Sequence, residues 1–296
     1  MMTPMAGVLH VDKPVGLTSH DVVNYVRRLA GIRRVGHSGT LDPMATGLLI
    51  ICLGKATRLV EYLVGLDKEY LATIHLGRET DTYDGEGQIT AEKRVEVTEQ
   101  QMDKALELFR GQIEQVPPMF SAVKVDGQPL YRRARLGEDI ERPPRQVTIY
   151  DLKQFSWNSP LLKLRISCSS GTYIRSIAHD LGQVLGCGAY LSALRRTAIG
   201  EITVEEATTL GQLDSEKWRQ HLQPLDSAVH HLPSLKLTTG QVHRISQGQR
   251  IPLDEVRHPA LESPVRAYDQ AGNFIGILII DQEQWKPHKV LYQPDL

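Results

Sequence analysis

The stretch Gly36-His37-Ser38-Gly39-Thr40-Leu41-Asp42-Pro43-Met44-Ala45-Thr46-Gly47 decides how this chain is interpreted. Its three glycines and one proline exclude the interior of a regular helix. The apolar run over residues 48–53 follows at once and predicts a buried strand. A glycine-rich loop that leads into a buried strand holds its side chains in place and leaves its backbone open to a ligand. We therefore expect a functional loop here.

Asp42 is the only acidic residue in this loop. Because Pro43 follows it, Asp42 is biased towards an extended backbone, and the next residue has no N–H to offer its carboxylate. An Asp-Pro pair in a loop is also typical of an ordinary Asx-type turn. On this stretch alone, a catalytic carboxylate and a turn residue are both open interpretations.

The length and composition indicate one large and one small globular domain. The chain has 296 residues, 41% hydrophobic and 23% charged, as is usual for a soluble protein. The formal net charge of −1 gives no argument for or against nucleic acid. Three widely spaced cysteines predict neither a disulfide framework nor a zinc site. With no signal-like or membrane-spanning pattern, we expect a cytoplasmic protein.

The spacing of the hydrophobic residues, with glycine and proline at the ends of the segments, predicts a series of strands and helices rather than a repeat protein. The expected strands cover residues 7–13, 48–53, 68–77 and 120–125, with a hairpin over 147–157 and 161–169. The expected helices run from the Thr18-Ser19 cap to Gly31, over 56–64, from the Thr98 and Gln101 capping box to Phe109, and from Pro129 to Gly137.

A further helix is predicted after Gly171, with Thr172 as its N-cap. Its apolar face consists of Ile174, Ile177, Ala178 and Leu181, and Arg175 is expected in the first turn and off that face. A cation at a helix N-terminus opposes the helix dipole at a cost of about 0.3–1 kcal/mol. We therefore expect Arg175 to serve another purpose.

A boundary lies between Pro224 and Pro233, after which the expected helices and strands become shorter. A helix over 238–246 and strands over 265–268 and 274–280 predict a compact β-rich unit. We expect a first domain of residues 1–232 and a second of residues 233–296, and we expect so small a unit to dock on the first.

Three near-matches to other motifs fail, and these failures exclude a serine hydrolase, a nucleoside triphosphatase and a calcium loop. The positions that fail are Thr40 for the nucleophile elbow, Leu49 and Ala56 for the phosphate loop, and Tyr83 and Gly85 for the calcium loop. The pair His230-His231 beside a proline is typical of a linker rather than a metal site.

At this point the sequence resembles the TruB family of tRNA pseudouridine synthases over nearly its whole length. The matching fragments, in order, are Lys13-Pro14-x-Gly16, the loop from Gly36 to Pro43, Lys68-Glu69-Tyr70, Leu76-Gly77 through Thr80-Asp81-Thr82, Pro117-Pro118-x-x-Ser121-Ala122-x-Lys124, Gly171-Thr172-Tyr173-Ile174-Arg175 and Leu194-Arg195-Arg196.

The resemblance implies an α+β fold, with a mixed, largely antiparallel central sheet flanked by helices and a small PUA-like RNA-binding domain at the C-terminus. It implies isomerisation of uridine to pseudouridine at position 55, in the T arm of tRNA. It also implies no metal, no organic cofactor, no obligate protein partner and a monomer. Whether the carboxylate attacks the sugar, attacks the base or assists elimination stays open.

The resemblance further implies roles for six residues. These are Asp42 as nucleophile, Arg175 as its ion-pair partner, Tyr70 as the ring that stacks on the flipped base, Tyr173 and Leu194 as lining of the base pocket, and His37 as support for the extruded RNA loop. Without the resemblance, Tyr70, Tyr173 and Leu194 would be interpreted as core residues, Arg175 as a surface arginine and His37 as a solvated loop histidine.

The chemistry of these residue types agrees with that implication. Cleaving the glycosidic bond leaves an electron-poor sugar, which a carboxylate can stabilise or capture. Pairing with Arg175 would keep Asp42 ionised against the desolvation that raises the pKa of a buried carboxyl. A hydrolase would need a second carboxylate to activate water, so the competing enzyme is an N-glycosidase using Asp42 with Asp84. A non-enzymatic RNA chaperone is the other alternative.

The target base lies inside a folded RNA loop and must be extruded, at a cost of a few kcal/mol. Because RNA loops are recognised by shape and stacking, a net charge of −1 is compatible with binding. The candidate phosphate contacts are Arg27, Arg28, Arg33, Arg34, Lys124, Arg132 and Arg133.

Overall fold

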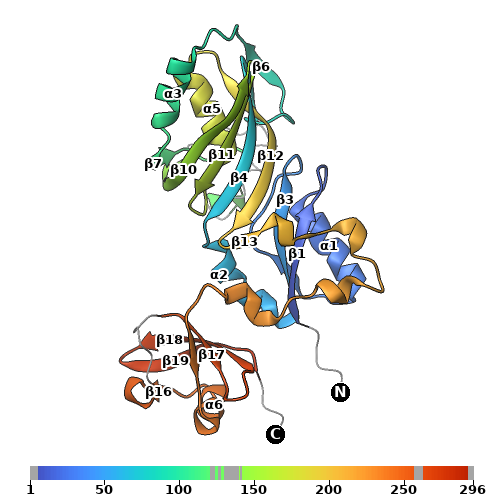
Figure 1. The fold of residues 1–296 in the computed structure, drawn as a ribbon, viewed down its shortest axis with the longest axis vertical. Helices are drawn as coiled ribbons and strands as arrows, with labels where there is room; N and C mark the ends of the chain where they lie inside the picture. Colours follow the sequence, from blue (N-terminus) through green and yellow to red (C-terminus); the bar gives the residue numbers. More distant parts are fainter. Residues whose placement is uncertain are drawn as a thin grey trace.

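The computed structural model describes residues 6–120, 124–125, 128–129, 140, 142–256 and 263–292. A ten-stranded sheet has the order β14-β1-β3-β12-β4-β11-β10-β7, with β2 paired to β3 and β13 paired to β12 (Figure 1). Its strands are β1 Gly7–Lys13, β2 Val35–His37, β3 Thr46–Leu53, β4 Lys68–Leu76, β7 Gly111–Gln115, β10 Arg145–Asn158, β11 Leu161–Cys168, β12 Ala189–Ile199, β13 Ile202–Thr203 and β14 Thr208–Thr209.

The sheet is mixed and mostly antiparallel, which confirms the expected α+β class. Only the β1–β14 and β3–β12 pairs are parallel. The β3–β12 pair forms a narrow seam between two halves of the sheet, because it pairs only Arg195 with Thr46 and Arg196 with Gly47. Gly47 has φ +99°, and a Cβ there would lie 2.2 Å from the Arg196 carbonyl oxygen. Glycine is therefore required where the halves meet.

Each half of the sheet is covered by its own helices (Figure 1). Helix α1 (Ser19–Ala30) buries Val22, Val23 and Val26 against β1 and β3. Helices α3 (Glu99–Glu107) and α5 (Ile174–Val184) bury apolar faces against β4, β10 and β11. Two such apolar layers on one sheet confirm the expected helix-flanked architecture.

The local signals that placed these helices act as expected. Thr18 and Asp21 form a capping box at the start of α1, and Gly31 ends the helix in the left-handed conformation with φ +67°. Thr98 and Gln101 form a second box at α3. The helix expected over 56–64 is correct in its second half only, since 3-10 helix η1 (Gly54–Leu59) precedes α2 (Val60–Val64).

The region between β4 and β10 is only partly described. Strands β5 (Arg78–Thr80) and β6 (Ile89–Glu92) flank the polar loop, and β8 (Lys124–Val125) pairs with β9 (Gln128–Pro129). Pro129 therefore belongs to a strand, and the rest of the helix expected up to Gly137 lies outside the described residues. Short 3-10 turns follow β12, namely η2 Val204–Glu206, η3 Leu210–Gln212, η4 Trp218–His221 and η5 Leu225–Val229.

A second sheet at the opposite end of the molecule from α3 has the order β15-β17-β18-β19-β16 (Figure 1). Its elements are β15 Ser234–Lys236, α6 Thr239–Ser246, β16 Ile251–Pro252, η6 Leu253–Glu255, β17 Val265–Tyr268, β18 Phe274–Asp281 and β19 Gln284–Val290. Lys55 donates to the Leu291 carbonyl at 2.8 Å and Arg58 to the Val290 carbonyl at 2.6 Å, so η1 holds this unit against the large sheet.

None of the helices in the described ranges combines the length and apolarity needed to cross a membrane. Among the same residues, no cluster of histidine, cysteine and acidic side chains has the arrangement of a metal site.

Candidate active site

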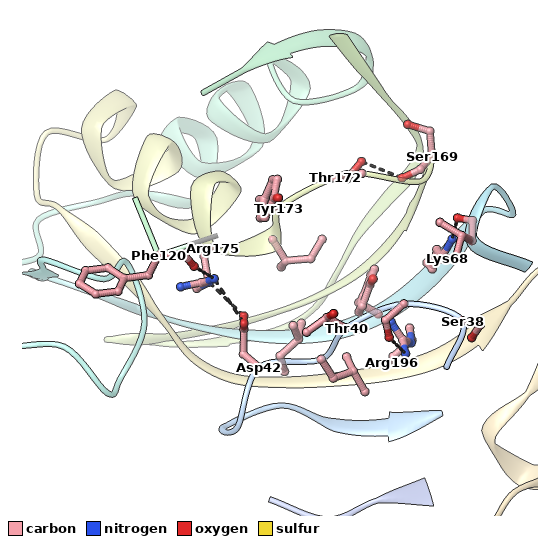
Figure 2. Close-up of a pocket in the computed structure, with 17 residues that line it drawn as sticks. Ser38, Thr40, Asp42, Lys68, Phe120, Ser169, Thr172, Tyr173, Arg175 and Arg196 are labelled. Carbon is pink, nitrogen blue, oxygen red and sulfur yellow. Dashed lines mark hydrogen bonds and ion pairs between the residues drawn. The ribbon is translucent and has the colours of Figure 1, made fainter. Parts of the chain in front are cut away.

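A cavity of about 280 Å³ opens over the seam between the two halves of the large sheet (Figure 2). The loop before β3 supplies Asp42, strand β4 supplies Tyr70, and β12 supplies Leu194 and Arg196. The start of α5 supplies Tyr173 and Arg175. Residues 42, 70, 173, 175 and 194, five of the six implied by the resemblance, therefore line one cavity.

Asp42 and Arg175 form a two-pronged ion pair across this cavity (Figure 2). The distance from Arg175 Nε to Asp42 Oδ2 is 3.1 Å, and the distance from Nη2 to Oδ1 is 3.3 Å. Such fork-to-fork pairing fixes the orientation of a carboxylate as well as its charge. The Asp42 side chain keeps 33% of its surface exposed, whereas that of Arg175 keeps 6%. The carboxylate is thus the member of the pair that a ligand can reach.

The helix start differs from the sequence-based expectation. Thr172 is not the N-cap: Tyr173 holds that position, and the Thr172 hydroxyl donates to the Ser169 carbonyl at 2.9 Å. Arg175 does lie in the first turn, but it is buried rather than surface-exposed. It also donates to the Phe120 carbonyl at 2.8 Å and to the Thr82 carbonyl at 3.3 Å. These acceptors explain a cation at a helix N-terminus.

Asp84 is a second carboxylate on the same guanidinium, with Arg175 Nη1 at 3.1 Å from its Oδ2. Its other oxygen accepts from the Thr82 hydroxyl at 2.6 Å and from the Glu86 N–H at 3.1 Å. Only 4% of the Asp84 side chain is exposed. Both carboxylate oxygens of Asp84 therefore already accept hydrogen bonds from the protein. From the sequence, Asp84 has a role only in the competing glycosidase, although the Thr80-Asp81-Thr82 fragment lies next to it.

Burial raises the pKa of Asp42 above its ordinary value of 3.8, because the surrounding walls remove most of the water from its charged form. The Arg175 guanidinium opposes that rise, and the charge of Asp84 adds to it. Glu86 lies close enough for both carboxylates to help raise its pKa as well, after its own desolvation. This end of the cavity therefore brings the carboxyl groups of Asp42, Asp84 and Glu86 together near the Arg175 guanidinium.

The opposite end of the cavity is aromatic and cationic (Figure 2). The Tyr70 side chain is buried on β4, and its hydroxyl lies close enough to the Arg196 guanidinium for that charge to act on the pKa of the phenol. Desolvation raises the pKa of Tyr70, so the phenol is protonated at neutral pH. Lys68, two residues before it, lines the same end; it donates to the Val64 and Leu66 carbonyls, and burial lowers its pKa to about 8.

Arg196 is a functional candidate that the sequence analysis missed. Its side chain is only 1% exposed, and it donates to the Leu48 carbonyl at 2.7 Å and to the Gly39 carbonyl at 3.1 Å. No carboxylate pairs with it in the described part of the chain. Desolvation lowers the pKa of Arg196, while Tyr70 acts against that change. The fragment Leu194-Arg195-Arg196 was the available signal.

Lys13 fixes the backbone beside Asp42. This fully buried ammonium donates to the carbonyls of Pro14 at 3.0 Å, Leu17 at 2.6 Å and Pro43 at 3.3 Å. Burial lowers the pKa of Lys13 to about 8, against the opposing charge of Asp42. The Lys13-Pro14-x-Gly16 fragment thereby ties β1 to the loop that presents the carboxylate.

Tyr173 is positioned by Gln115, a buried residue at the end of β7 that the sequence analysis did not single out. The Gln115 side chain accepts from the Tyr173 N–H at 2.7 Å and donates to its carbonyl at 3.0 Å. The side-chain amide of Gln115 thereby holds both the backbone N–H and the backbone carbonyl of Tyr173, which fixes this backbone at the wall of the cavity.

His37 lies apart from these residues. It faces a second, more open cavity of about 500 Å³, which it shares with His20, Arg27, Arg33 and Arg34. Its Nδ1 accepts the Gly39 N–H at 3.2 Å, and burial lowers its pKa. Three of the candidate phosphate contacts are therefore gathered around His37. Arg132 and Arg133 fall outside the described residues, as does the side chain of Lys124.

Two solved structures share the fold over most of this chain. One is the structure of an H/ACA RNP bound to a substrate RNA containing 2'-deoxyuridine, with TM-score 0.75, 25% identity, and coverage of 98% of this chain and 86% of that one. The other is the archaeal box H/ACA sRNP Nop10-Cbf5 complex, with TM-score 0.73, 25% identity, and coverage of 96% and 85%.

Sequence relatives are closer. A protein of Dehalococcoides mccartyi named tRNA pseudouridine synthase B is 45% identical over 97% of this chain and 96% of its own length. The protein of the same name from Pasteurella multocida is 42% identical over 97% and 95%.

Family models match successive parts of the chain. Residues 27–174 match the N-terminal domain of TruB family pseudouridylate synthases, residues 175–230 the tRNA pseudouridylate synthase B C-terminal domain, and residues 233–291 the C-terminal model of pseudouridine synthase II TruB. The fold and these models define a pseudouridylate synthase. The chain belongs to the TruB family of these enzymes.

Proposed function

We propose that this protein is a cytoplasmic, monomeric tRNA pseudouridine synthase that converts the uridine at position 55, in the T arm, to pseudouridine. The observation that carries the proposal is the Asp42 carboxylate, one-third exposed in a cavity and held by two nitrogens of Arg175. The names of the curated relatives support tRNA as the substrate.

In the proposed reaction, the bond between ribose C1′ and uracil N1 breaks, the uracil turns over, and a bond between C1′ and C5 forms. The hydrogen lost from C5 balances the one gained at N1, so no co-reactant is consumed. Asp42 stabilises or captures the electron-poor intermediate that follows cleavage. The role needs the ionised carboxylate, which the Arg175 guanidinium favours against desolvation.

The state of Asp84 favours an isomerase over an N-glycosidase. Water activation needs a carboxylate with a free oxygen facing the sugar. Both Asp84 oxygens accept hydrogen bonds from Arg175, Thr82 or the Glu86 backbone, and its side chain is almost fully buried. Among the described residues that line the cavity, Asp42 is the one carboxylate, which is suited to a reaction that must keep water away from the detached base.

The remaining residues fit a flipped base. In this proposal Tyr70 stacks on the uracil, and Tyr173 and Leu194 form the walls around it. His37, with Arg27, Arg33 and Arg34, supports the extruded RNA from the neighbouring cavity. Residues 233–296 serve as a PUA-like RNA-binding domain beside the catalytic domain of residues 1–232. The reaction uses neither metal nor organic cofactor.

Nucleoside analysis of an unmodified tRNA transcript tests the proposal. We expect the wild-type protein to form one pseudouridine, at position 55, and Asp42→Asn to form none while its affinity for tRNA stays within about ten-fold, because phosphate contacts dominate affinity. Asp103→Asn, an exposed aspartate on α3, is the matched control and should be fully active.

Three results would contradict the proposal. Activity retained by Asp42→Asn would show that Asp42 is not the nucleophile. Release of free uracil would identify an N-glycosidase, and tRNA binding with unchanged nucleoside content would identify a chaperone.

A further inference from the structure

A basic cavity of about 420 Å³ lies where η1 meets the C-terminal sheet. Its lining includes Lys55 and Arg58 from η1, Arg250 from the turn before β16, and Lys286 and His288 from β19. We call it the junction cavity. These segments are far apart in the sequence, and the fold alone brings their charges together.

The charges of the junction cavity are far from balanced. Asp281 is the one carboxylate that pairs with its cations among the described residues, at 2.8 Å from Arg250 and 3.2 Å from Lys286. Lys55 and Arg58 donate to backbone carbonyls only, so their charges are not neutralised there. Four cations face one carboxylate in a protein whose formal net charge is −1.

The donors that remain suit a phosphate. Arg58 donates from Nη1 to the Val290 carbonyl, which leaves its other nitrogens for an anion. Lys55 has three N–H groups and donates one of them to the Leu291 carbonyl. Arginine and lysine with spare donors around a concave surface form the usual phosphate contact of RNA-binding proteins. The one aromatic ring among the described lining residues is that of His288, whose Nδ1 is hydrogen-bonded to the Tyr62 hydroxyl at 2.6 Å, so we expect the cavity to contact the RNA backbone rather than to recognise bases.

The junction cavity and the Asp42 cavity lie at opposite ends of β3. Asp42 belongs to the loop that enters the strand, and Lys55 follows Leu53 at its exit. Eight residues of strand span roughly 25 Å. An RNA with its target base beside Asp42 must therefore extend well beyond that base to reach Lys55.

We propose that the junction cavity binds the phosphodiester backbone of tRNA outside the T-arm stem-loop. This inference rests on the proposed function, because it takes tRNA as the substrate. The cavity would add affinity for the whole tRNA and leave the chemical step unchanged, since none of its residues touches the reacting base.

Binding assays with two RNAs test the inference. The double variant Arg250→Gln/Lys286→Gln removes two cations whose side chains bond Gln282 and Asp281 rather than η1. We expect the Kd for full-length tRNA to rise about ten-fold and the slope of log K against log salt to fall by about 1 to 2. The Kd for an isolated T-arm stem-loop should stay within about two-fold, because that RNA does not extend to the cavity.

The control variant Lys217→Gln/Lys236→Gln removes the same charge from exposed positions outside the cavity, and should bind both RNAs as the wild type does. Equal losses for both RNAs, no loss for full-length tRNA, or an equal loss in the control would overturn the inference. Tripolyphosphate binding that the double variant abolishes, with tRNA affinity unchanged, would assign the cavity to a free phosphate instead.

Pseudouridine formation on the stem-loop keeps the two proposals separate. If the wild type modifies the stem-loop but the double variant binds full-length tRNA normally, only the junction cavity assignment fails. If the wild type modifies neither RNA, the proposed function fails.

Discussion

The two ends of the Asp42 cavity each contain a buried arginine, and they differ in what surrounds it. Arg175 faces two carboxylates, so its end of the cavity carries one excess negative charge when both are ionised. Arg196 faces carbonyl oxygens and the Tyr70 hydroxyl, and its neighbour Lys68 is also bonded only to carbonyls. The cavity therefore has an acidic end and a cationic end.

This difference suits a reaction that separates charge. A ribose that loses its base becomes electron-poor, and the base that leaves takes up electron density. Preorganised charges that match a developing dipole stabilise the transition state without reorganisation. Under the proposed function, the sugar belongs at the Asp42 end and the detached uracil between Tyr70 and the Arg196 end.

The largest expected effect comes from removing the cation of the acidic end. Arg175→Gln should lower the single-turnover rate of pseudouridine formation by about 10³-fold, because Asp42 loses its orienting partner. Since the Arg175 charge lowers the pKa of Asp42 against burial, its loss should move the acidic limb of the rate profile to higher pH. In the wild type that limb should already lie above 3.8.

The rate is measured against pH with saturating enzyme. Arg165→Gln, an exposed arginine on β11, serves as the control and should have the wild-type profile. An acidic limb that does not move would show that Arg175 does not govern the ionisation of Asp42.

A smaller effect is expected at the cationic end. Tyr70→Phe keeps the ring but removes the hydroxyl beside Arg196, so the rate should fall by about 10²-fold if the hydroxyl moves a proton. Taking a polar neighbour from a buried guanidinium should also lower the free energy of unfolding by about 1–3 kcal/mol. Denaturant titration checks the second part, with Tyr190→Phe as the control outside the cavity. Unchanged stability would mean that Arg196 does not depend on Tyr70.

The smallest effect is expected for His37, which belongs to neither end. His37→Gln should raise the Kd for tRNA by about five-fold, the value of one hydrogen bond of about 1 kcal/mol. The single-turnover rate with saturating enzyme should change less than two-fold or so, because His37 faces the cavity with Arg27 and Arg33. A rate loss as large as that of Tyr70→Phe would place His37 in the chemical step.

Much of the fold could be predicted because its signals are local. The Thr18 cap and the left-handed Gly31 at the end of α1 each act within a few residues. The hairpin of β10 and β11 was predicted by the polar turn between two apolar runs. The outlying 3-10 turns η2 to η5 were not predicted, because they lack the periodicity of a longer element.

The site was harder to predict because its contacts are long-range. Without the family resemblance Arg175 would be interpreted as a surface arginine, since nothing near it in the sequence shows that Asp42 and Asp84, 133 and 91 residues away in the chain, lie next to it in space. Arg196 was missed for the same reason: Leu48, Gly39 and Tyr70 come from other elements. The roles of the five cavity residues and of His37 stay predictions, which the variants above can test.

The narrow seam at Gly47 has a consequence for how the enzyme fails on heating. Asp42 comes from the loop before β3, and Arg175 comes from α5 on the far half of the sheet. Proteins open in cooperative units that differ in free energy, so two halves joined by few strand pairs can part before either one unfolds. Under the proposed function, a brief parting of β3 from β12 draws the Asp42 carboxylate away from the Arg175 guanidinium, so we expect activity to be lost at a lower temperature than the one that unfolds either half.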